Sequence, residues 1–110
     1  MRAWDSQSSR LVLQNYEPSF ELGFLEEALK EWRKLDNTIS KQFKEKLAER
    51  LAQPHVPAAR LSGHKNRYKI KLRSAGYRLV YEVRHSELIV LVVAVGRRDR
   101  NAVYKAAALR

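Results

Sequence analysis

Apolar side chains alternate with polar, mostly basic ones in two segments of the sequence. In residues 68–73, lysine and arginine alternate with tyrosine, isoleucine and leucine, and residues 77–84 alternate nearly as well. This period of two predicts two β-strands that form a hairpin around Gly76. The alternation places four cations on one face of the hairpin: Lys69, Lys71, Arg73 and Arg78. Because like charges on one face repel one another, we expect this face to bind an anion.

These residue types suit the cleavage of an RNA phosphodiester by its own 2′-hydroxyl group. That reaction needs a base for the hydroxyl proton, cations for the charge that develops on the phosphate, and a donor for the leaving 5′-oxygen. An aromatic ring could also stack on a splayed base. The residues that could meet these demands are Lys69, Lys71, Arg78, Arg98 and Tyr104. A non-catalytic phosphate-binding face would use the same residue types, and composition does not separate the two.

The distribution of charge also indicates a nucleic-acid partner. The 110-residue chain has a formal net charge of +10. Residues 60–110 hold thirteen basic and three acidic residues, whereas residues 1–59 hold nine of each. Cations concentrated in one part of a chain are typical of proteins that neutralise phosphates.

Composition argues against several other kinds of site. The chain has no cysteine, which excludes disulfides, thiolate zinc sites and a cysteine nucleophile. His55, His64 and His85 show no metal-ligand spacing, so we expect surface histidines, no metal and no other cofactor. A histidine-pair ribonuclease stays open, although nothing in the sequence brings two histidines together. The longest apolar run is too short to span a bilayer and the polar N-terminus resembles no signal peptide, so we predict a cytoplasmic protein without a membrane partner.

Apolar periodicity predicts the elements that position these side chains. Residues 1–18 show no period, so we expect them to be a mobile extension. The pattern of residues 19–110 predicts a single α+β domain. Two amphipathic helices form a hairpin in it, and we expect their lysine and glutamate residues to face solvent. The expected order is strand 19–24, helix 25–35, helix 38–51, strands 68–73 and 77–84, a strand buried on both faces at 88–95, and a short helix 101–109.

Side-chain parity suggests a register for the hairpin. If the numbers of opposed residues sum to 151, Leu72 meets Leu79 on the apolar face, whereas a slip by one residue would pair cations with core residues. In this register Glu82 lies opposite Lys69 and would raise its pKa. Which lysine could act as a base therefore stays open.

Four segments closely resemble the RelE family of bacterial toxins. They are Leu-Lys-Glu-Trp-Arg-Lys-Leu at 29–35, Tyr-Lys-Ile-Lys-Leu-Arg-Ser at 68–74, Gly-Tyr-Arg-Leu-Val-Tyr at 76–81, and 95–104, which runs from Val-Gly-Arg-Arg-Asp-Arg to Val-Tyr. The resemblance extends from about residue 19 to the end. It implies a small fold of two helices on a mainly antiparallel sheet. It also implies a ribosome-dependent mRNA endonuclease from a toxin–antitoxin pair.

The resemblance assigns roles by motif. Lys69 and Lys71 would be the general-base and phosphate-stabilising candidates, Arg78 would hold the scissile phosphate, Arg98 would assist the leaving oxygen, and Tyr104 would orient the base. Other cations would dock on ribosomal RNA: Lys65, Arg67, Arg73, Arg97 and Arg100.

The resemblance also implies partners. The ribosome would present the mRNA in its A-site. A RelB-like protein antitoxin would cover the basic face or displace the last helix, and operator DNA would be bound only through the antitoxin complex. Two alternatives stay open, a non-catalytic RNA- or DNA-binding module and a relative of the same fold that acts on DNA gyrase.

Overall fold

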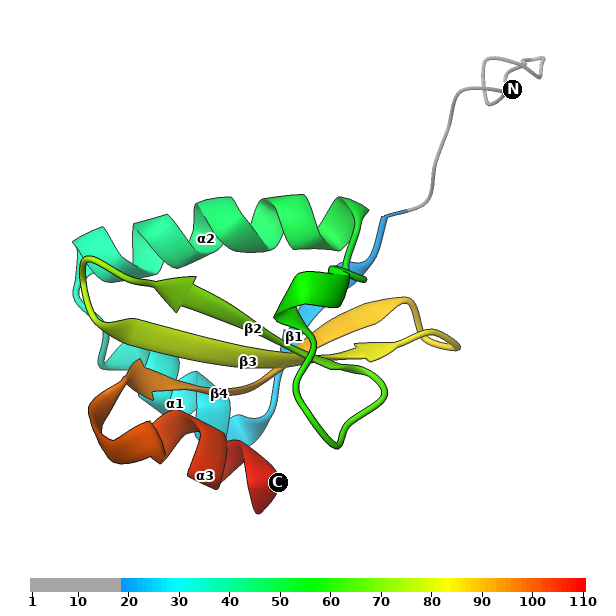
Figure 1. Cartoon of the computed structure of the whole chain (residues 1–110). Helices are drawn as coiled ribbons and strands as arrows, with labels where there is room; N and C mark the ends of the chain where they lie inside the picture. Colours follow the sequence, from blue (N-terminus) through cyan, green and yellow to red (C-terminus); the bar gives the residue numbers. More distant parts are fainter. Residues whose placement is uncertain (1–18) are drawn as a thin grey trace, which may run out of the picture.

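The computed structural model describes residues 19–110, so the predicted extension over residues 1–18 lies outside the described residues. Its elements are β1 (Glu21–Phe24), α1 (Glu26–Arg33), α2 (Asn37–Ala52), the 3-10 helix η2 (Pro57–Ala59), β2 (Arg67–Leu72), β3 (Tyr77–Arg84), β4 (Ile89–Arg97), the 3-10 helix η3 (Asp99–Asn101) and α3 (Ala102–Ala108). The strands form one sheet in the order β1-β4-β3-β2. β1 pairs with β4 in parallel, and the other pairs are antiparallel. The predicted α+β fold is confirmed (Figure 1).

Helices α1 and α2 pack on one face of the sheet. The predicted spacing of apolar residues in α2 places Ile39, Phe43 and Leu47 in the core. The Asp36 carboxylate accepts a hydrogen bond of 2.9 Å from the Ile39 N–H, which caps the start of α2. Trp32 of α1 lies against Phe43, with 6.2 Å between ring centroids. Within residues 19–110, no helix is long and apolar enough to cross a membrane.

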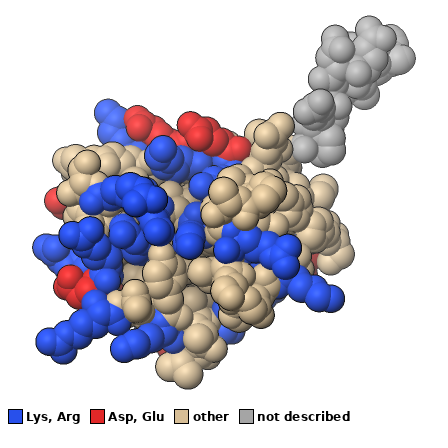
Figure 2. Space-filling model, in the orientation of Figure 1, with Lys and Arg blue, Asp and Glu red and all other residues tan. Residues whose placement is uncertain are grey.

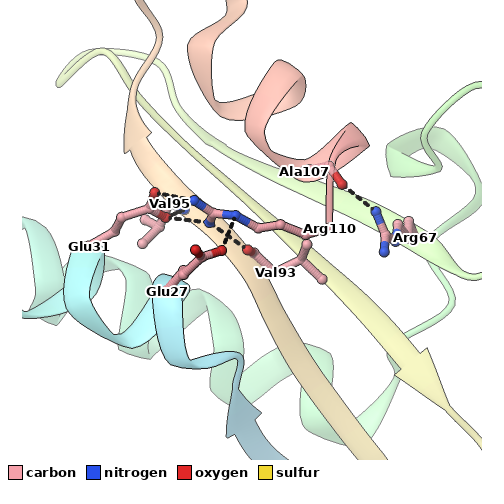
Figure 3. A network of polar contacts seen from close by, with 7 residues as sticks. All are labelled: Glu27, Glu31, Arg67, Val93, Val95, Ala107 and Arg110. Atoms are coloured by element: carbon pink, nitrogen blue, oxygen red, sulfur yellow. Dashed lines mark hydrogen bonds and ion pairs between the residues drawn. The ribbon is translucent and has the colours of Figure 1, made fainter.

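Helix α3 packs on the opposite face of the sheet. Its Val103 and Ala107 are buried against Val80 of β3 and against Val93 and Ala94 of β4. β4 also contributes to the core under α1 and α2, so the prediction of a strand buried on both faces is confirmed. α3 is short, and basic side chains tie it to the rest of the domain (Figure 3).

The hairpin register differs from the prediction by two residues. Leu72 pairs with Tyr77, and Ile70 pairs with Leu79, so the numbers of opposed residues sum to 149. The turn therefore holds four residues, including Arg73, which was predicted to lie in the strand. Gly76 closes the turn in the left-handed region at φ 75° and donates its N–H to the Leu72 carbonyl at 2.8 Å, a conformation that glycine adopts without a steric penalty.

This register changes the neighbours of the cations without changing their face. Parity is the same for sums of 149 and 151, so Lys69, Lys71 and Arg78 still share one face. Lys71 now lies opposite Arg78, and Lys69 lies opposite Val80. The prediction that Glu82 faces Lys69 is wrong, because Glu82 pairs with Arg67.

Candidate active site

The Gly76 turn brings three of the predicted catalytic residues to one end of the sheet. Lys71 and Arg78 are direct cross-strand partners. The Arg98 backbone N–H donates to the Gly76 carbonyl at 2.9 Å. The Arg98 side chain passes close to the turn, because a Cβ on Gly76 would lie 3.7 Å from its Nε. Strand pairing and the end of β4 therefore gather Lys71, Arg78 and Arg98 at this turn.

Repulsion among the cations lowers the pKa of Lys71 below its ordinary value. The largest cause is the charge of Lys69, followed by burial and by the charges of Arg73 and Arg78. Each of these effects disfavours the ammonium form. The lowered pKa increases the fraction of the neutral amine that a general base requires, which makes Lys71 a candidate for that role.

The pKa of Lys71 leads to a prediction about stability. The folded state disfavours the ammonium form of Lys71. At pH values below the folded-state pKa of this lysine, its charge therefore lowers the free energy of unfolding. The cost fades as pH rises from the folded pKa toward the ordinary value of 10.5. Lys71→Gln should therefore raise the midpoint of urea unfolding at pH 7, and this gain should disappear above about pH 10.5.

A control on α3 makes the measurement specific to the site. Lys105 is exposed and lies outside the group of cations that act on Lys71. Lys105→Gln should leave the midpoint nearly unchanged at both pH values. A Lys71→Gln protein that is less stable than the unmodified protein at pH 7 would contradict the electrostatic account.

Tyr104 lies on α3, on the face of the sheet that carries the lysines. It packs against the buried cluster that includes Val80, and Val80 is the cross-strand partner of Lys69. Its hydroxyl is buried and has no hydrogen-bond partner within residues 19–110. An unpaired buried donor is costly, so this hydroxyl is an unsatisfied polar group on the face that carries the lysines.

The five cations predicted to dock on RNA have different surroundings. Arg67 is engaged internally, because it donates to Glu82 at 3.0 Å and to the Ala107 carbonyl at 2.7 Å. Burial would raise the pKa of Glu82, but hydrogen bonds from Arg84 and Arg67 outweigh it and lower that pKa. Arg97 lies over the Tyr77 ring, 5.4 Å from its centre. The others are exposed at the surface, two in a loop or turn and the last in η3: Lys65, Arg73 and Arg100.

Sequence patterns did not reveal that two histidines meet. His55 and His85 are exposed, as predicted for surface histidines, but their Nε2 atoms are 2.8 Å apart. The Nδ1 atom of His55 also lies 2.9 Å from the Tyr68 hydroxyl. This pair sits at the opposite end of β2 and β3 from the Gly76 turn, so it is separate from the catalytic set. Residues 19–110 contain no group of three side chains that could hold a metal ion.

Arg50 is a further residue that sequence analysis missed. The prediction for this helix concerned its lysine and glutamate residues and gave Arg50 no role, yet Arg50 donates to the Lys69 carbonyl at 3.3 Å and to the Tyr81 hydroxyl at 2.8 Å. No local pattern could signal these contacts, because they join residues 19 and 31 positions apart.

Comparison with known proteins places this arrangement in a family. A model of the ParE toxin of type II toxin–antitoxin systems matches residues 22–102. The mRNA interferase toxin RelE of Escherichia coli K12 is 50% identical over 92 residues, which cover 84% of this chain and 97% of the relative. The mRNA interferase RelE of Shigella flexneri matches to the same extent.

Solved structures agree with the sequence comparison. The isolated RelE toxin of E. coli superposes with a TM-score of 0.72 at 49% identity and covers 84% of this chain and 98% of that one. The toxin in the intact E. coli RelBE toxin–antitoxin complex superposes with a TM-score of 0.71 at 50% identity. The match covers 74% of this chain and 100% of that one. The resemblance seen in the sequence is confirmed, and the chain belongs to the RelE family of toxins.

Proposed function

We propose that this protein is the toxin of a toxin–antitoxin pair and acts as an mRNA interferase. It cleaves mRNA in the ribosomal A-site by attack of the 2′-hydroxyl on the adjacent phosphate, which leaves a 2′,3′-cyclic phosphate. The observation that carries the proposal is the pairing of Lys71 with Arg78 beside Arg98 on one sheet face. The relatives named mRNA interferases support the same conclusion.

Each residue of the set has a chemical role in this reaction. Lys71 removes the 2′-hydroxyl proton, since its neighbours lower its pKa. Lys69 and Arg78 stabilise the negative charge on the phosphate, and Arg98 assists the departing 5′-oxygen. Tyr104 orients the base. A lysine is still mostly protonated near neutral pH, so the toxin alone is a modest catalyst. The ribosome must contribute by aligning the message for the reaction.

The proposed activity defines the partners of the protein. The basic face, formed by Lys69, Lys71, Arg73 and Arg78, binds mRNA on the ribosome, and the action on ribosomes places the protein in the cytoplasm. A RelB-like antitoxin neutralises the toxin, and operator DNA is reached only through their complex. RelE forms such a complex with its antitoxin in E. coli.

A cleavage assay tests the function against its alternatives. Full-length protein added to ribosomes programmed with a defined mRNA should cut the message within the A-site codon. The same mRNA without ribosomes should stay intact, and a chelator should not change the cleavage. Absence of cleavage on ribosomes would identify a non-catalytic binder, and inhibition of DNA gyrase supercoiling would identify the gyrase-directed relative.

Binding to the ribosome should depend strongly on salt. All of the excess charge lies in residues 60–110, and each phosphate contact releases counter-ions. In pelleting assays the affinity for 70S ribosomes should fall at least tenfold between 50 and 200 mM salt, on the order expected for several contacts. The circular dichroism of the free protein should not change over this range. An affinity that is independent of salt would contradict electrostatic docking.

A further inference from the structure

A cleft beside β2 is not accounted for by the catalytic roles above. It has a volume of about 330 Å³ and lies between the end of α2, η2 and the edge strand β2. Four cations and three small apolar residues line it: Arg50, Lys69, Lys71, Arg73, Val56, Ala58 and Ala59. No carboxylate is among these lining residues. We call this site the basic cleft, and Figure 2 shows how Lys and Arg side chains gather on the side of the molecule where β2 lies in front.

Within residues 19–110, the hydrogen bonds of Arg50 at the cleft all come from one nitrogen, Nη1. Nη1 donates to the Lys69 carbonyl at 3.3 Å and to the Tyr81 hydroxyl at 2.8 Å. The buried Tyr81 hydroxyl in turn donates to the Pro54 carbonyl at 2.7 Å. The guanidinium carbon also lies 5.6 Å from the centre of the Tyr81 ring. These contacts hold the planar group in place, and no carboxylate among residues 19–110 pairs with it.

The remaining donors of Arg50 suit a phosphate. Its Nε and Nη2 atoms have no hydrogen-bond partner among residues 19–110. A guanidinium presents its donors as a rigid fork that matches two phosphate oxygens. Because Nη1 already fixes the fork, little side-chain entropy is lost when the other donors bind.

The rest of the cleft suits a nucleotide more than a bare anion. Val56, Ala58 and Ala59 form the apolar wall of the cleft. Pro57 at the start of η2 stiffens the backbone of this wall. Sites for organic ligands combine such apolar surface with a few fixed polar groups. A phosphate on the cations would leave the attached base against the apolar residues.

We propose that the basic cleft binds the nucleotide next to the scissile bond, with Arg50 donating to its phosphate. The proposal rests on the proposed function, because Lys69 and Lys71 belong to both the cleft and the catalytic set. Lys71 faces Arg78 across the hairpin and also lines the cleft. An RNA strand can therefore pass from the scissile phosphate at Arg78, past Lys71, to the cleft at the β2 edge of the sheet, where Arg50 lies.

Neutral linkages in the message test the contact. In a methylphosphonate linkage, a methyl group replaces one charged phosphate oxygen. One such linkage is placed in the mRNA either directly before or directly after the scissile linkage, and the mRNA is bound to ribosomes. For the unmodified protein, substitution of one flanking linkage should slow single-turnover cleavage about tenfold. Arg50→Gln should cleave the normal message about tenfold more slowly and show no further loss with that linkage. An equal additional loss in both proteins would overturn the contact.

Two variants separate this contact from general effects of charge and folding. Lys44 is exposed on α2 and does not line the cleft, so Lys44→Gln should keep the full tenfold penalty from the neutral linkage. Arg50→Lys keeps the charge but replaces the planar guanidinium fork with an ammonium group, so part of the penalty should return. A Lys44→Gln protein that behaves like Arg50→Gln would show that net charge alone is responsible, and the cleft would be rejected.

Binding to the free full-length protein separates the cleft from the cleavage reaction. A 5′-phosphorylated deoxydinucleotide lacks the 2′-hydroxyl and cannot be cleaved. In NMR titrations it should shift the backbone amides of residues 69–73 and 56–59, and Arg50→Gln should abolish both shifts. Inorganic phosphate should shift only residues 69–73, because it has no base. Dinucleotide binding without cleavage on ribosomes would reject the proposed function and retain the cleft, whereas no shift at either segment would reject the cleft.

Discussion

Arg98→Ala should reduce single-turnover cleavage of mRNA on the ribosome by about 100- to 1000-fold. The side chain is expected to act on the charge of the departing oxygen, which is greatest in the transition state. The backbone N–H of Arg98, rather than its side chain, bonds the Gly76 carbonyl, so the turn should keep its geometry in the variant. The affinity for ribosomes should change little, since one of thirteen basic residues in the second half is removed.

A modified substrate identifies the role of Arg98. When sulfur replaces the leaving 5′-oxygen, the thiolate departs without a proton or a strong donor. Cleavage of this substrate by Arg98→Ala should approach the rate of the unmodified protein, whereas Lys71→Ala should stay slow. An equal loss on both substrates would assign Arg98 to charge on the phosphate instead. Arg84→Ala is the control, because Arg84 pairs with Glu82 and points to solvent with its side chain 47% exposed.

The faces of the sheet could be predicted because they depend only on parity. Alternation in residues 68–73 and 77–84 placed Lys69, Lys71 and Arg78 on one face, as the structure confirms. The register could not be fixed in this way, since registers that differ by two residues keep the same parity. It depends on the four-residue turn, which the left-handed conformation of Gly76 closes.

Contacts between distant segments were outside the reach of the sequence patterns. Arg50, Arg67 and Arg110 all look like ordinary surface cations in the sequence. In the folded domain they reach the Lys69, Ala107 and Val93 carbonyls, respectively. The family resemblance predicted a catalytic set by motif, but it carried no information about these contacts because the three arginines lie outside the quoted motifs.

Arg110 forms the most extensive of these contacts and anchors α3. Its guanidinium donates to both carboxylate oxygens of Glu31 at 3.0 and 2.9 Å and to the Val93 carbonyl at 3.0 Å (Figure 3). Glu27 adds an ion pair at 3.3 Å. Glu31 also accepts from the Val95 N–H at 3.1 Å. These hydrogen bonds and charges raise the pKa of Arg110, with Glu31 as the largest cause.

Removing Glu31 should destabilise the domain and release α3. Glu31→Ala leaves Arg110 without its main counter-ion and the Val95 N–H without its acceptor, so the free energy of unfolding should fall by about 2 kcal/mol. This value is below that for a fully buried pair, because the side chains of Arg110 and Glu31 are 17% and 30% exposed. Glu27→Ala should cost about 0.5 kcal/mol or less, since the Glu27 side chain is 68% exposed.

Hydrogen exchange distinguishes release of α3 from general destabilisation. In seven-residue α3, only Val103 and Ala107 are buried, so this helix has little apolar contact to hold it once Arg110 is freed. Its amides should exchange faster in Glu31→Ala by a larger factor than those of β3. Cleavage should also decrease, because α3 carries Tyr104, and an antitoxin that displaces α3 should bind the variant more tightly. Equal acceleration of exchange in α3 and β3, with unchanged antitoxin affinity, would show that Arg110 stabilises the whole fold and does not control α3.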